Sequence, residues 1–331
     1  MPVPRRPVRR AFSLTELIFA VALIALLLAI LLPALLGIRG AGERSSTQAA
    51  MRQMIQGFTN YASDHDGALL PGYVLDPTLI DLRVRDAAGN DISGTEDAAP
   101  YVWRLAEYLD DWRVVTTGYG ASLRERLSAE VADDVVGGAS AGDDALGVAR
   151  IPAIGMNTVW VGGDDRHFTV DPGTAGPGNR DPWTNRYETQ AARSLSEVRN
   201  TSRLVVFAPT ARWNGDGWQP ASSFPVTAGE RIGAPALMPP RFPDADGVLQ
   251  ANPPAWQADA DRATAVSPNP VGSWDPDGDA GVPALRTTGD ELLPTARFDG
   301  SVGATTLPEL QGDFRAWDPR ANPVIIGDDG D

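Results

Sequence analysis

Residues 9–38 read RRAFSLTELIFAVALIALLLAILLPALLGI, and the last 22 of them, Leu17 to Ile38, carry no charged side chain. At about 1.5 Å per residue, an α-helix of this length spans roughly 33 Å, which is enough to cross the hydrocarbon core of a bilayer. A secretory signal peptide has a shorter apolar stretch, roughly 7–15 residues. The sequence therefore predicts a helix that stays in the membrane, at least at first.

Charges before this stretch predict its orientation. Four arginines lie among the first ten residues, and flanking positive charge stays on the cytoplasmic side, so everything after Arg39 is expected to be exported.

Glu16 stands at the start of the apolar run, where a lone acid in hydrocarbon costs about 2.5–3.5 kcal/mol. Either Glu16 lies at the level of the lipid headgroups, where it costs little, or it has a partner.

The segment from Arg9 to Leu17 resembles the processing signal of type IV prepilins and type II secretion pseudopilins. In that family a prepilin peptidase removes a short basic leader that ends in a small residue, usually Gly. The resemblance implies that Ala11 precedes the cut, that Phe12 becomes the new N-methylated terminus, and that Glu16 becomes the fifth mature residue. Ala11 departs from the usual Gly. Pro33 matches a proline that the family often carries late in this helix, and it predicts a kink.

The resemblance also implies a role for Glu16. In an assembled filament its carboxylate neutralises the terminal amine of a neighbouring subunit, and because an unpaired buried charge is strongly destabilising, this pairing selects the register of assembly. The implied protein is a structural subunit, not an enzyme, of a type II secretion-like pseudopilus or a type IV pilus-like filament. Its implied partners are the peptidase, other pilin or pseudopilin subunits and an assembly platform in the bacterial inner membrane. Its head would lie in the periplasm or at the cell surface.

Two other classes stay open. The pair Arg9-Arg10 before Phe12 also fits a twin-arginine export signal, with Gly40-Ala41-Gly42 as a cleavage site, and such a substrate could be an enzyme. His65 and His167 lack any sequence context typical of a nucleophile, so the sequence favours no catalytic site. The second class is a membrane-anchored module that binds calcium or glycans.

The amino-acid composition excludes several kinds of site and binding partner. The chain has no cysteine, which excludes disulfides and thiolate metal sites. Its 28 basic residues are all arginine, and removal of the leader leaves 24 of them against 43 acids, a side-chain balance of −19. Such a surface repels nucleic acid and attracts divalent cations, so we expect no nucleic-acid partner.

We expect the chain to divide into a leader (1–11), a membrane and filament-core helix (12–38), an exported half of the same helix (39–66) and a head (67–331). Gly37, Gly40 and Gly42 predict a flexible neck. The expected fold is α+β and pilin-like: the long helix packs on an antiparallel β-sheet, and a Pro/Gly/Asp-rich, loop-rich insert occupies about 212–283. The apolar positions that predict the exported half recur at helical spacing and precede a stop at Asp64–Gly67: Met51, Met54, Ile55, Phe58 and Ala62.

Further segments resemble pseudopilin-like proteins of planctomycete-type bacteria. They include Tyr61–Gly67, a helix at Trp103–Leu109 and a strand at Ile151–Asn157. The residues alone also predict a helix at 122–136, a strand at 203–208, a capping box from Ser194 to Glu197, and a hairpin at 298–302 whose tight two-residue turn is Asp299-Gly300.

One segment has the chemistry of a metal site. Asp275, Asp277 and Asp279 alternate with Pro276 and Gly278, and such carboxylates suit the oxygen coordination of calcium. A helix-loop-helix calcium loop needs an acid at its twelfth position, where this chain has Arg286. A calcium site and a solvated acidic loop are therefore both open interpretations.

Overall fold

The computed structural model of the chain describes residues 14–74, 82–87, 89–95, 98–137, 147–158, 160–163, 191–212, 232–237, 241–243, 249–251, 257–259, 264–266, 280–283, 292–313 and 316–317. Within these ranges it describes only the backbone of residues 31–41, 130–137, 147, 212, 241–283, 307 and 311. The chain forms two compact units, Met1–Glu43 and Arg44–Asp331.

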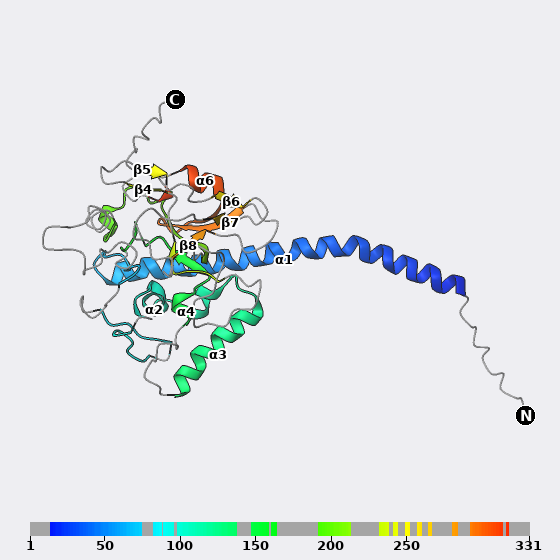
Figure 1. The fold of residues 1–331 in the computed structure, drawn as a ribbon, viewed down its shortest axis with the longest axis horizontal. Helices are drawn as coiled ribbons and strands as arrows, with labels where there is room; N and C mark the ends of the chain where they lie inside the picture. Colours follow the sequence, from blue (N-terminus) through cyan, green and yellow to red (C-terminus); the bar gives the residue numbers. More distant parts are fainter. Residues whose placement is uncertain are drawn as a thin grey trace, which may run out of the picture. The chain divides into compact units, whose positions relative to one another are not determined.

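One helix, α1 (Leu14–Asp64), contains 51 residues and contributes to both units (Figure 1). Its backbone is helical through Gly37, Gly40 and Gly42, so these glycines do not end the helix, and the flexibility predicted there stays a prediction. Each glycine weakens a helix by only about 1 kcal/mol relative to alanine, whereas a second helix would need a new and costly nucleation. Glycines therefore do not suffice to interrupt so long a helix.

The second half of α1 buries one apolar face in the core of the second unit. Met51, Met54, Ile55, Phe58 and Ala62 are all almost fully buried, as their spacing predicts. Residues that recur every three or four positions lie on one side of a helix, so this stripe gives the segment a single packing face.

The helix ends at Asp64, where the sequence predicts its stop. Asp66 and Gly67 both adopt positive φ angles, 53° and 84°, and the N–H of Gly67 donates to the carbonyl oxygen of Ala62 at 2.8 Å. A left-handed residue that returns its N–H to the last turn is a common helix terminator, and glycine adopts this conformation without steric cost.

The second unit contains a six-stranded sheet in the order β1-β3-β8-β2-β9-β10. Its strands are β1 (Ile154–Met156), β2 (Val205–Arg212), β3 (Ala236–Leu237), β8 (Ala280–Pro283), β9 (Leu292–Arg297) and β10 (Val302–Thr306). Two separate antiparallel pairs are β4 (Arg241–Pro243) with β5 (Leu249–Ala251), and β6 (Gln257–Asp259) with β7 (Thr264–Val266). The fold is therefore α+β with a long N-terminal helix, as predicted.

The sheet is mixed, which corrects the prediction of an antiparallel one. β3 pairs in parallel with both β1 and β8, whereas β2 pairs antiparallel with β1, β8 and β9, and β9 with β10. Parallel neighbours need a connection of a dozen or more residues. Both β3 and β8 come from the expected insert at 212–283, so this stretch supplies strands and the long connections between them.

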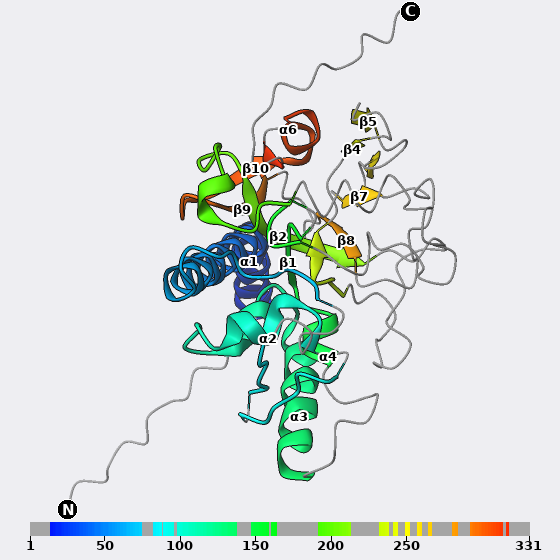
Figure 2. The same cartoon turned by 90° about the vertical axis from the view of Figure 1, so that its left-hand side faces the viewer.

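Aromatic side chains join α1 to the sheet. Phe58 meets Phe207 of β2 edge-on, with 6.1 Å between ring centroids, and Phe298, just after β9, at 5.8 Å. Tyr101 lies 5.6 Å from Phe207. Figure 2 shows α1 beside β2 and β9. Phe207 is thus the point at which α1, the sheet and the segment containing Tyr101 meet.

The other helices of the described residues are shorter than α1: α2 (Tyr101–Ala106), η3 (Trp112–Thr116), α3 (Ala121–Gly137), α4 (Gly147–Arg150), η4 (Leu195–Glu197) and α6 (Leu307–Gly312). α3 agrees with the helix predicted at 122–136. α2 is shorter than the predicted helix at 103–109. The N–H groups of Tyr108 and Leu109 donate to the carbonyls of Leu105 and Ala106, three residues earlier, so the α-helix tightens and ends there.

A buried arginine ties α2 to two neighbouring segments. Arg104 is only 3% exposed, and its guanidinium donates to the carbonyl oxygens of Ala98 (2.5 Å), Ala99 (2.8 Å), Pro71 (3.0 Å) and Gly72 (3.1 Å). Hydrogen bonds from a charged donor are the strong ones, so this side chain fixes the loop after α1 against the start of α2.

The β9–β10 hairpin forms where it was predicted, but its turn differs. Gly300 alone has a positive φ, 84°, in the turn, and its N–H donates to the carbonyl of Arg297. Asp299 instead accepts the N–H of Ser301 with its side chain at 2.9 Å. The loop is therefore a three-residue turn with a left-handed glycine, not a two-residue turn with two positive φ angles.

A short helix begins after Ser194, as the capping-box spacing predicts, but the side chain of Ser194 makes no capping bond to its backbone. The Ser194 hydroxyl bonds to Ser196 and to the Glu197 carboxylate, and the N–H that Glu197 accepts is that of Arg193. A complete capping box exists at α6, where Thr306 accepts from the N–H of Glu309 at 3.3 Å and Glu309 accepts from that of Thr306 at 3.0 Å.

Candidate functional site

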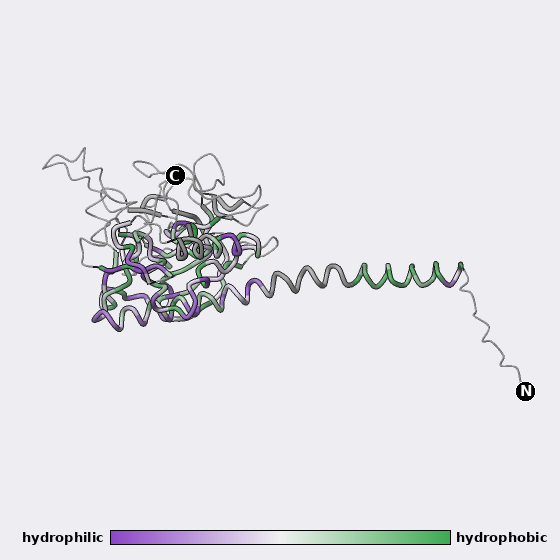
Figure 3. The backbone as a smooth tube through the Cα atoms, turned by 90° about the horizontal axis from the view of Figure 1, so that it is seen from below, coloured by the Kyte–Doolittle hydropathy of each residue, from purple (hydrophilic) through white to green (hydrophobic). Residues whose placement is uncertain are grey.

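The first half of α1 exposes its apolar side chains. Over residues 14–30, the large apolar side chains are between 49% (Leu23) and 75% (Leu14) exposed. Figure 3 shows this part of the helix as hydrophobic over most of its length. A helix that is apolar on all sides is stable only where other apolar groups cover it, either lipid or neighbouring helices. This surface is the first candidate site.

Glu16 lies in the first turn of α1, and its side chain is exposed. The N-terminus of a helix carries a partial positive charge, which stabilises a carboxylate there by about 0.3–1 kcal/mol. The position is thus favourable both for a carboxylate at the headgroup level and for one that pairs with an amine of another chain.

Ala11 and Phe12, the predicted cleavage residues, lie outside the residues that the structure describes. They belong to residues 1–13, and Pro33 lies where only the backbone of α1 is described. In the described parts of the chain, no helix combines the length and the apolarity that crossing a bilayer requires.

The predicted calcium ligands, Asp275, Asp277 and Asp279, also lie outside the described residues, as does His167. Among the residues that are described, no group of three or more His, Cys, Asp or Glu side chains is placed to hold a metal ion. Calcium binding therefore stays a prediction from the sequence.

His65 takes part in an aromatic cluster at the end of α1. Its ring stacks on Tyr61 at 3.9 Å between centroids, and its Nδ1 lies 2.9 Å from the Tyr61 carbonyl oxygen. Tyr108 meets Tyr61 edge-on at 5.5 Å. Burial raises the pKa of the Tyr61 hydroxyl, and the charge of Arg104 partly opposes that rise. These contacts anchor the end of α1.

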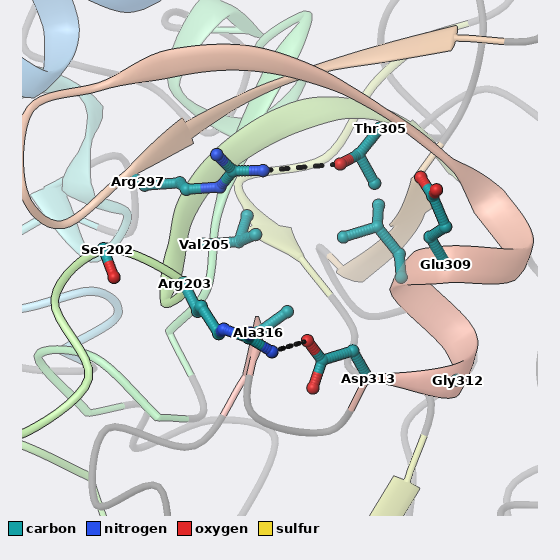
Figure 4. A pocket seen from close by; sticks show the side chains of 10 residues that line it. Ser202, Arg203, Val205, Arg297, Thr305, Glu309, Gly312, Asp313 and Ala316 are labelled. Carbon is teal, nitrogen blue, oxygen red and sulfur yellow. Dashed lines mark hydrogen bonds and ion pairs between the residues drawn. The ribbon is translucent and has the colours of Figure 1, made fainter.

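A cavity of about 730 Å³ lies between the β9–β10 hairpin and α6 (Figure 4). Two arginines and two acids line it, together with hydroxyl groups and apolar side chains. Arg203 forms an ion pair with Asp313 at 3.0 Å, and Arg297 lies 3.5 Å from the hydroxyl of Thr305. The lining residues are Ser202, Arg203, Val205, Arg297, Thr305, Glu309, Leu310, Gly312, Asp313 and Ala316.

Sequence reasoning missed this cavity because its walls come from segments about a hundred residues apart. Arg203 precedes β2 and Arg297 ends β9, so only the pairing of these strands brings them together. One local signal was available. Thr306 and Glu309 have capping-box spacing directly after the predicted hairpin, which predicts a helix at the place where α6 forms one wall.

No protein-family model matches the chain, and comparisons with curated proteins and with solved structures find no match either.

Proposed function

We propose that this chain is a structural subunit of a type II secretion-like pseudopilus or a type IV pilus-like filament. A prepilin peptidase would remove residues 1–11, and the first half of α1 would hold the subunit in the bacterial inner membrane before assembly. The observation that carries the proposal is the contrast within α1. Its second half is packed into a globular unit, whereas its first half is an apolar surface with an acid in the first turn.

The exposed apolar side chains supply the driving force for assembly. Before assembly these side chains contact lipid, so neighbouring helices gain close packing with one another and release lipid, and they do not gain transfer out of water. Many such side chains are exposed along residues 14–30, so these packing contacts can form along the length of the helix. The head would then be displayed outside the membrane, in the periplasm or at the cell surface.

Glu16 would set the register of this bundle. Cleavage before Phe12 creates a terminal ammonium four residues ahead of Glu16, and in a bundle the ammonium of one subunit could neutralise the carboxylate of the next. A buried charge that loses its partner typically costs about 3–5 kcal/mol. Misaligned helices would therefore be rejected.

The test combines processing with assembly in cells. Mass spectrometry of the extracted protein should find a mature N-terminus at Phe12, and deletion of the peptidase should leave residues 1–11 attached. Glu16→Ala and Glu16→Gln should both insert into the membrane and be cleaved, yet fail to enter filaments.

Glu43→Ala is the matched control, because Glu43 is an exposed acid of the same helix beyond the apolar run. It should assemble like the wild type. Retention of the leader in peptidase-positive cells, a mature start beyond Ala41, or normal assembly of Glu16→Gln would refute the proposal. Failure of an Arg9→Lys, Arg10→Lys double variant to be exported would instead indicate twin-arginine export.

A further inference from the structure

We propose that the cavity between the β9–β10 hairpin and α6 binds a ligand that carries a single carboxylate on a short apolar body. The proposal concerns the second unit alone and does not depend on membrane insertion or filament assembly. It follows from which charged groups in the cavity walls have ionic partners and from the apolar side chains between these groups.

Arg297 supplies the binding group. Its guanidinium lies beside Gly303 of β10, where an added Cβ would be 3.5 Å from one terminal nitrogen, an ordinary van der Waals contact. Figure 4 shows the guanidinium directed toward Thr305. Its one long hydrogen bond to the Thr305 hydroxyl, 3.5 Å, occupies one of five N–H donors, and no carboxylate of the described residues pairs with it.

The other charged groups of the walls already have partners. Arg203 pairs with Asp313 at 3.0 Å, and the Glu309 carboxylate accepts the N–H of Thr306 in the capping box of α6. These contacts hold the walls in place. Of the arginines that the structure describes in these walls, Arg297 is therefore the one without an ionic partner, and its planar fork matches a carboxylate.

The remaining walls define the rest of the ligand. Val205, Leu310 and Ala316 also line the cavity, and because they are only 1%, 2% and 7% exposed they present a small apolar floor between the polar groups. A volume of about 730 Å³ is in the range of sites for small molecules or for a short peptide segment. The carboxylates of Glu309 and Asp313 on the α6 wall oppose a second negative charge. A monoanion with a short apolar body fits these conditions best.

Butanoate is a suitable probe, because it has a carboxylate on a three-carbon tail. Calorimetric titration of the full-length protein in detergent micelles should show saturable binding with a Kd of about 1 mM or below. n-Butylammonium has the same tail with the opposite charge and should not bind. A blocked peptide, acetyl-Ala-Asp-Ala-amide, presents the carboxylate on a peptide. Tighter binding of the peptide than of butanoate identifies a peptide-borne ligand, and the reverse order identifies a free acid.

Variants separate this site from general attraction to arginine. Arg297→Gln should raise the Kd at least about tenfold. Arg113→Gln removes an exposed arginine elsewhere and should leave the Kd unchanged. Absence of saturable binding of either carboxylate, equal binding of butylammonium, or unchanged affinity in Arg297→Gln would overturn the proposal.

Discussion

Replacement of Arg104 by methionine tests how strongly one buried cation holds the second unit together. Methionine has a similar length and fills most of the same space without charge or hydrogen-bond donors. The substitution therefore removes a charged donor from the carbonyl oxygens of Ala98, Ala99, Pro71 and Gly72, and of these the Ala99 oxygen still accepts the N–H of Val74.

Two opposing contributions determine how much Arg104→Met changes the free energy of unfolding. A hydrogen bond to a charged group contributes about 1.5–3 kcal/mol, so the four bonds of Arg104 amount to roughly 6–12 kcal/mol. Removal of the guanidinium also relieves the cost of burying its charge, which is several kcal/mol. We therefore expect Arg104→Met to lower the free energy of unfolding by about 3–5 kcal/mol. Arg104→Lys keeps the charge but has fewer donors, and it should lose about half as much.

Urea unfolding of the full-length protein in detergent micelles, followed by tryptophan fluorescence, measures this change. The matched control is Arg113→Met, because the Arg113 side chain is 61% exposed and rests on the ring of Trp112 at 5.6 Å. That variant should lose less than about 1 kcal/mol. If Arg104→Met and Arg113→Met have equal unfolding free energies, the four carbonyl contacts do not hold the loop after α1, and the reasoning fails.

Further substitutions test separate parts of the second unit. Burial raises the pKa of the Tyr101 hydroxyl well above 10, so the unfolded chain loses this proton first. The free energy of unfolding should therefore fall as the pH rises above about 10. Tyr101→Phe should reduce this dependence by up to about 1.4 kcal/mol per pH unit, measured by urea unfolding. Gly162 has a φ of 78°, and a Cβ there would overlap the carbonyl oxygen of Leu70. Gly162→Ala should therefore lower the melting temperature strongly. Gly94→Ala is the control and should not lower it, because nothing lies within 4 Å of a Cβ at that position. Phe58→Ala should cost about 3–5 kcal/mol of unfolding free energy, because it leaves a cavity where α1 meets the sheet.

The parts of the fold that the sequence predicts are those with local causes. The buried stripe from Met51 to Ala62 is encoded in a spacing of three and four residues, and the end of α1 in the positive φ angles of Asp66 and Gly67. The hairpin position was predictable for the same reason. Its turn type was not, because Asp299-Gly300 suits both a two-residue and a three-residue loop, and register between the strands decides between them.

The parts that the sequence does not predict depend on distant pairing. β3 and β8 contain two and four residues, too few for a periodic pattern, and they lie in a stretch rich in proline and glycine. Their parallel pairing with each other and with β1 requires knowledge of the whole sheet. The cavity has the same origin, since the pairing of β2 with β9 places Arg297 opposite Val205 in the cavity wall.

Because the two halves of α1 differ in burial, substitutions in one half should affect the stability of the second unit and substitutions in the other should affect assembly. Phe58 is buried against the sheet, so its replacement should destabilise the second unit and leave the apolar surface of residues 14–30 unchanged. Glu16 is exposed at the other end of the helix, so its replacement should leave unfolding of the second unit unchanged and affect only what that surface contacts. A Glu16 variant that lowers the unfolding free energy of the second unit as much as Phe58→Ala would show that the carboxylate serves the fold of this chain, and the exposed apolar helix would then need another explanation.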